Sequence, residues 1–132
     1  MYLKASGTPI TGTCQLTNGV PGPTNFTLQQ VSGGATYTLK ATELVVIVSL
    51  SISSNDTAQP TITVDDGITA GNYIARVLAK VYTGSALPAA VLTFPPGVCP
   101  TRRGVNPRAT GSAVTAAKTV EITFVGYVTD TT

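Results

Sequence analysis

Residues 43–54, ELVVIVSLSISS, restrict the fold of this chain more than any other stretch. Every even position from 44 to 52 is aliphatic, and residues two apart share one face of a β-strand, so these positions are predicted to face one way. The odd positions change from valine and isoleucine at 45 and 47 to serine at 49, 51 and 53. The stretch therefore predicts a strand that is buried on both faces where it begins and open to water on one face where it ends.

The composition of the whole chain points to the same class. Threonine and valine, with 23 and 15 residues, are stiff at χ1 and favour strands. Charged residues make up 11% of the 132 residues, against roughly 25% in an ordinary soluble domain, and histidine and tryptophan are absent. We expect one all-β domain whose surface is either rich in hydroxyl groups or partly buried in an assembly.

Short apolar stretches separated by turn signals recur along the chain. The Asp66–Gly67 pair is typical of a turn that follows a strand. Further strands are predicted at residues 35–40, 61–65, 89–94, 112–116 and 118–129. This order predicts a two-sheet antiparallel β-sandwich, jelly-roll-like, over residues 35–132.

Residues 72–83, NYIARVLAKVYT, fit two interpretations. Their apolar side chains form a stripe at helical spacing, with Asn72 as an N-cap and Gly84 as a stop. The same residues also alternate with the period of a strand. Because a lone helix would have to find a sheet face to cover, the all-β composition favours the strand.

Residues 1–34 contain nine glycines and prolines, which predicts an extended N-terminal arm or a chain of short edge strands. The first residues lack the apolar segment of a secretory signal. The longest apolar stretch is far shorter than the ~20 residues that span a bilayer. We expect a chain made in the cytoplasm without a cleaved leader, and no contact with a membrane.

The two cysteines, Cys14 and Cys99, are 85 positions apart. A disulfide between them would close a long loop and stabilise the fold by roughly 4–5 kcal/mol in the chain-entropy model. Without an export signal, two free thiols are the default expectation. Both alternatives stay open at the level of the sequence.

No motif for catalysis or for a cofactor is visible. Histidine, the usual base beside a nucleophile, is absent. Among the six acids, Glu43 and Glu121 are predicted to lie on a solvent face, and Asp65 and Asp66 are predicted to belong to a turn rather than to a Ca²⁺ site. We expect no enzymatic activity, no metal and no cofactor, and a net charge of +2 is too small to indicate nucleic-acid binding.

Residues 92–111 gather three of the four arginines and four of the nine prolines. Arginine is enriched at the centres of protein interfaces, and a loop stiffened by proline loses less entropy when it docks. Arg102, Arg103 and Arg108 are therefore candidate docking residues for an acidic partner. The alternative is an ordinary solvated loop.

Four pieces of the chain together resemble the decoration (cement) proteins of tailed-bacteriophage capsids. They are ELVVIVSLSISSNDTAQPTITVDDG, LTFPPGV, RRGV and GSAVTAAKTVEITFVGYV. The resemblance implies a homotrimer with a jelly-roll-like fold that binds the major capsid protein on the outside of the virion and stabilises the shell. It also implies an N-terminal arm that grips the capsid, and residues 1–34 suit that role.

A function of another class is the alternative. The chain would then be a recognition module that binds a glycan or a receptor, such as the head of a phage fibre or spike or of a bacterial adhesin. Tyrosines exposed on one face would favour this function.

Overall fold

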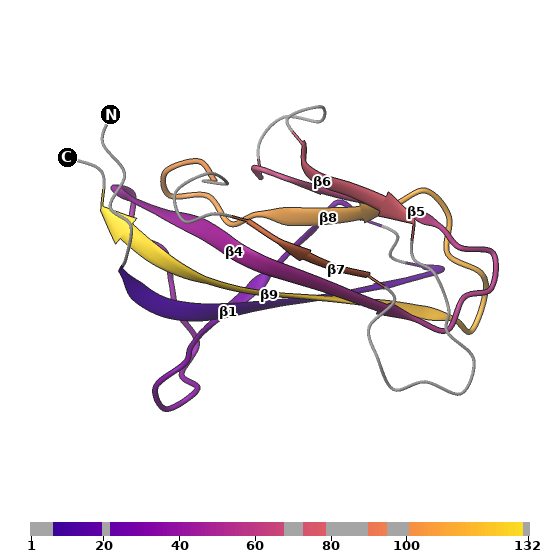
Figure 1. Cartoon of the computed structure of the whole chain (residues 1–132), viewed down its shortest axis with the longest axis horizontal. Coiled ribbons are helices and arrows are strands. Elements are labelled where there is room, and N and C mark those ends of the chain that lie inside the picture. Colours follow the sequence, from indigo (N-terminus) through magenta and orange to yellow (C-terminus); the bar gives the residue numbers. More distant parts are fainter. Residues whose placement is uncertain (1–6, 20–21, 68–72, 79–89, 95–100, 131–132) are drawn as a thin grey trace.

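The computed structural model describes residues 7–19, 22–67, 73–78, 90–94 and 101–130, and these form nine strands and no helix. The strands make two antiparallel sheets that pack face to face (Figure 1). The predicted all-β sandwich is therefore confirmed. No helix long and apolar enough to cross a bilayer occurs in the described part of the chain.

The larger sheet has five strands in the order β3-β1-β9-β4-β7, and the smaller has four in the order β2-β8-β5-β6. Figure 1 shows β1, β9 and β4 side by side along one layer, with β8, β5 and β6 in the other. The strand bounds are β1 Thr8–Thr17, β2 Thr24–Asn25, β3 Thr27–Gln30, β4 Glu43–Ser54, β5 Thr61–Asp65, β6 Tyr73–Leu78, β7 Ala90–Thr93, β8 Arg108–Gly111 and β9 Thr119–Asp130.

The main hydrophobic core fills the space between the sheets. Phe124 of β9 and Phe26, at the corner between β2 and β3, are both fully buried, and their rings meet edge to face with centroids 5.1 Å apart. Gly12 of β1 lies directly opposite Phe124, and a Cβ atom there would come within 1.9 Å of that ring. The absence of a side chain at residue 12 thus makes room for the ring at the centre of the core.

A β-bulge in β4 overturns one prediction about this strand. The register against β9 shifts between Ile47 and Ser49, so that Val48 is an extra residue. A bulge moves the side chains beyond it to the other face. The even positions therefore do not share a face: Val45 and Ile47 point into the main core before the bulge, and positions 50 and 52 do so after it.

The valine-rich half of β4 is buried on its outer face as well. Leu44 and Val46 form a second, smaller cluster there with Tyr127 of β9, and Val48 packs beside them. The serine-rich half is only partly covered on that side. The predicted change from a strand buried on both faces to one open on one face is confirmed.

Thr8–Thr17 form an inner strand of the larger sheet, which corrects the expectation of an arm over these residues. β1 pairs with β9 along its whole length, from Thr8 opposite Val128 to Thr17 opposite Thr119, and with β3 on its other side. Its inward side chains, such as Ile10 and Leu16, are fully buried in the core, which an arm could not provide. β3 is an edge strand of this sheet, and residues 1–6 lie outside the described part.

The strands predicted at residues 35–40 and 112–116 are absent, and the choice between helix and strand at residues 72–83 is settled for part of that stretch. Residues 35–40 make only an isolated bridge, between Thr36 and Gln29, because this segment passes outside the edge strand β3. Residues 112–116 are not a strand, and the pairing to β5 comes from Arg108–Gly111. Tyr73–Leu78 are a strand, as the composition favoured, and residues 79–83 lie outside the described part.

Candidate functional site

The residues that carry the predicted docking arginines link the two sheets of the sandwich. We call residues 101–108 the arginine segment. On one side it is hydrogen-bonded to β4: the Thr101 and Gly104 N–H groups donate to the carbonyls of Val45 and Glu43, each at 2.8 Å. The Val45 N–H donates in return to Thr101 Oγ1 at 3.1 Å. The segment thereby continues the edge of the larger sheet beyond the short strand β7.

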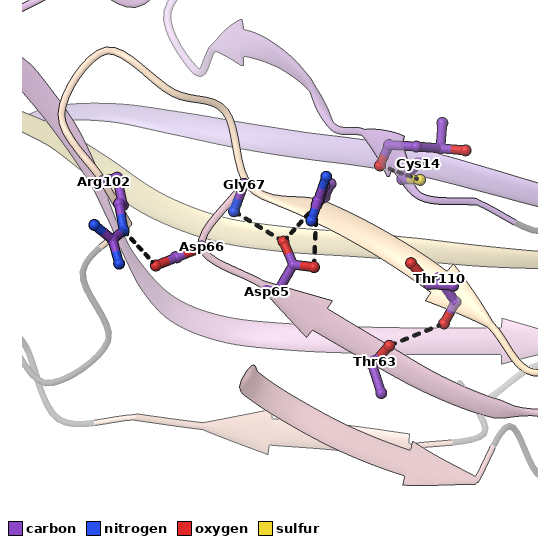
Figure 2. Close-up of polar contacts among 9 residues, drawn as sticks. Cys14, Thr63, Asp65, Asp66, Gly67, Arg102 and Thr110 are labelled. Carbon is purple, nitrogen blue, oxygen red and sulfur yellow. Dashed lines mark hydrogen bonds and ion pairs between the residues drawn. The ribbon is translucent and has the colours of Figure 1, made fainter. Parts of the chain in front are cut away.

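On its other side the arginine segment is tied to the end of β5 in the smaller sheet. Arg102 Nε donates to Asp66 Oδ2 at 2.7 Å (Figure 2). Arg108 Nε donates to both carboxylate oxygens of Asp65, at 2.9 and 3.1 Å. Asp65 Oδ1 also accepts from the N–H of Gly67 at 2.8 Å. The predicted Asp-Asp-Gly turn is present, and its two acids hold two of the three arginines.

The arginine segment also holds the corner where the chain crosses from β2 to β3. The N–H of Phe26 donates to the Pro107 carbonyl at 3.0 Å, and Asn106 Nδ2 donates to the Phe26 carbonyl at 3.0 Å. Because Phe26 belongs to the central ring pair, these bonds position a core side chain. The arginine segment thus holds together the two sheets and the corner between β2 and β3.

The three candidate arginines differ in how much of each side chain is exposed and so able to contact a partner. The side chain of Arg108, within β8, is 21% exposed, that of Arg102 is 48% exposed, and Arg103 is exposed at the tip of the segment. The sequence marked the segment as unusual but did not reveal the partners of Arg102 and Arg108. Those acids lie 36 and 43 residues away, and no local pattern connects them.

Glu43 is buried, which corrects the prediction that it faces solvent. Tyr37 Oη donates to Glu43 Oε2 at 2.6 Å, and the Lys40 N–H donates to Oε1 at 2.9 Å, so the carboxylate anchors the segment before β4. Burial, together with the hydrogen bond and the negative charge of Glu43, raises the pKa of Tyr37 to about 12. Glu121 is exposed, as predicted.

Asp56 is fully buried and ties the turn after β4 to the segment before β9. Its Oδ2 accepts from the Thr115 N–H at 2.8 Å, while Oδ1 accepts from Thr115 Oγ1 at 2.8 Å and from the Ala58 N–H at 3.0 Å. The bond from the Thr115 backbone is the largest influence that lowers the pKa of this carboxyl group below its ordinary 3.8, against the opposing effect of burial. The group is a structural acceptor of three hydrogen bonds.

We expect Asp56→Asn to lower the Tm at neutral pH by about 5 °C or more, because an amide presents a donor where one N–H or hydroxyl donor already points. Because the pKa of Asp56 is lower in the folded protein than its ordinary value of 3.8, the ionised carboxylate stabilises the fold fully at pH values above 3.8. This stabilisation is lost as the pH falls through the lowered pKa. The Tm difference between wild type and variant, measured from neutral pH to well below 3.8, should therefore shrink in acid. A difference independent of pH would contradict this account.

Cys14 is buried and carries a free thiol in this structure. Its Sγ donates a weak hydrogen bond to the Thr24 carbonyl at 3.6 Å, and burial raises its pKa to about 11. The thiol is therefore protonated at neutral pH and is a poor nucleophile. Cys99 lies outside the described residues.

Within the described ranges, no group of three or more side chains is placed to hold a metal ion. Comparisons of the chain with protein-family models, with curated proteins and with solved structures found no match.

Proposed function

We propose that this chain is a structural protein of a tailed-phage virion that binds the outside of the capsid as a homotrimer and stabilises the shell. The observation that carries the proposal is that the carboxylates bind groups of the chain itself and hold its segments in place. Five of the six acids accept hydrogen bonds that hold the chain's own turns and segments, and these are Glu43, Asp56, Asp65, Asp66 and Asp130. A scaffold of this kind is suited to presenting a rigid binding surface.

The outer face of the larger sheet is consistent with a binding role. Its exposed and half-exposed positions around the middle of β9 carry hydroxyl and amide side chains, and Val125 is 47% exposed among them. Ser49 and Thr11 lie directly opposite Val125 on the two neighbouring strands. A broad, rigid and nearly uncharged face can lie against another protein without desolvating many charges.

The mechanism we propose is thermodynamic linkage. A protein that binds only the assembled shell stabilises it in proportion to the logarithm of ligand concentration over Kd. Three copies in one trimer convert the second and third contacts into intramolecular events, so weak individual contacts suffice. No step in this mechanism requires a reactive group.

Arg103 is the residue of the arginine segment best placed to reach a partner, because it is exposed while Arg102 and Arg108 are engaged with Asp66 and Asp65. An exposed arginine at the rim of an interface contributes mainly to association rate and salt dependence. The docking role that the sequence suggested for three arginines is thus proposed chiefly for this one.

We expect Arg103→Glu to weaken binding to expanded capsids of the parent phage by about tenfold at low salt, with an unchanged Tm. Lys40→Glu, an exposed reversal with the same change in net charge, should bind like wild type. Co-sedimentation with capsids measures occupancy, and light scattering of the free chain should give the mass of three copies. Equal occupancy of both variants would refute the role of Arg103, and a monomeric mass would refute the trimer.

A further inference from the structure

A polar hollow lies where the chain crosses from the smaller sheet to the larger one, between β2 and β3. β3 pairs with β1 only from Thr13, opposite Thr27, to Ile10, opposite Gln30. The ladder between them therefore begins directly after the corner at Phe26, which joins β2 to β3. A space of about 410 Å³ opens beside this point. It falls within the range of roughly 300–1,000 Å³ that is usual for small-molecule sites.

The polar side chains that line the hollow come from four strands. On the larger sheet Thr27, Thr13 and Thr123 lie directly opposite one another on three neighbouring strands, which places hydroxyl groups about 5 Å apart. Gln15 of β1 is opposite Glu121 of β9 in the same ladder. Asn25 enters the hollow from β2, and all of these side chains are exposed except the half-buried Thr123.

Among the described residues that line the hollow, Glu121 is the one with a charged side chain. It is exposed, and neither of the ion pairs found among the described residues includes it. Unlike the other five acids, Glu121 accepts none of the hydrogen bonds that hold the described segments of the chain together. Its carboxylate oxygens are therefore available to accept hydrogen bonds from a ligand that reaches the hollow.

The hydroxyl, amide and carboxylate groups that line the hollow favour some classes of ligand over others. Hydroxyls and amides both donate and accept hydrogen bonds, while the carboxylate only accepts. A Ca²⁺ ion takes 6–8 oxygen ligands, usually with several carboxylates, and this hollow offers one. Six of the described lining residues have neutral polar side chains: Thr13, Gln15, Thr24, Asn25, Thr27 and Thr123. A cationic ligand would meet one carboxylate among these neutral groups, whereas sugar hydroxyls can pair with the carboxylate and with every neutral group.

We propose that this hollow binds a neutral saccharide, with two adjacent sugar hydroxyls donating to the carboxylate of Glu121 and the amides of Gln15 and Asn25 binding hydroxyls beside them. None of the described residues that line the hollow is aromatic, so they offer no platform on which a sugar ring stacks, and we expect a Kd in the millimolar range. The inference does not depend on capsid binding.

The test is a titration followed through the backbone amide resonances of the isotope-labelled full chain. The probes are methyl α-mannoside, methyl β-galactoside and methyl β-glucoside, each to about 50 mM because the expected Kd is millimolar. We expect at least one of them to shift the amides of Gln15, Asn25 and Glu121 saturably. 2-(Hydroxymethyl)tetrahydropyran, which has a sugar-like ring without adjacent ring hydroxyls, should shift none of them.

Glu121→Gln removes the charge with little change in size and should weaken binding at least fivefold. Ser53→Ala is the matched control, because Ser53 lies opposite Glu121 on the other side, in β4, and does not line the hollow. It should bind like wild type. The proposal is overturned if no saccharide produces saturable shifts, if Glu121→Gln binds as well as Ser53→Ala, or if methylguanidinium or CaCl₂ binds at these residues more tightly than every saccharide.

Discussion

Replacing Phe124 by alanine is expected to lower the free energy of unfolding by about 3–5 kcal/mol. The side chain is fully buried in the main core and meets the ring of Phe26 edge to face, at an interplanar angle of 66°. Such a ring contact contributes roughly 0.5–1.5 kcal/mol beyond the buried area. The residues around it are held in two sheets by their ladders, so the cavity would close only in part.

Denaturant unfolding of the purified variant measures this loss. The matched control is Val125→Ala, because Val125 is the next residue of β9 but lies on the opposite face and is 47% exposed. Its cost should stay within about 0.5 kcal/mol, as for most surface substitutions. If the two variants lost similar amounts, the ring pair would not be the centre of the core.

The second large effect is expected from Arg108→Ala, which should lower the free energy of unfolding by about 2–4 kcal/mol. Its partner Asp65 is 5% exposed. Without the guanidinium group, a charged carboxylate stays buried with the N–H of Gly67 as its remaining hydrogen-bond donor among those described above. The loss of one partner from a buried pair costs more than the loss of both, because the other charge is left without compensation.

Two comparisons test this explanation. Arg102→Ala breaks the neighbouring pair, in which the arginine side chain is 48% exposed, and should cost no more than about 1 kcal/mol. The double variant with Arg108→Ala and Asp65→Ala should be more stable than the sum of the two single losses predicts, since no buried charge is stranded. Additive losses would show that the two side chains stabilise the fold independently of each other.

A regular side-chain period of two predicted two of the strands accurately. Residues 61–65 and the last strand alternate regularly, and both were found within one residue of the predicted bounds. The bulge at Val48 was not predictable, since an extra aliphatic residue in an aliphatic stretch leaves the pattern unchanged. Residues 35–40 alternate as a strand does, but they lie beyond an edge strand and make only one bridge.

The arginine segment shows a different limit of local patterns. The prolines and arginines of residues 92–111 marked this region as unusual, although its last four residues form β8. The acids that hold Arg102 and Arg108 were also noticed, as a turn of their own. What joins them is the antiparallel pairing of β5 with β8, which places Asp65 directly opposite Arg108. This pairing is a property of the sheet, and neither segment encodes it alone.

The pairing of the first described strand with the last has a mechanical consequence. Thr8 lies opposite Val128, so β1 begins at the same end of the larger sheet where β9 ends (Figure 1). The hydrogen bonds between antiparallel strands run across the strands. A force that pulls the two ends apart would therefore load these bonds one pair after another, as a zipper opens, instead of shearing them together. This sandwich should yield at low tension when it is held by its ends, however stable it is to heat or denaturant.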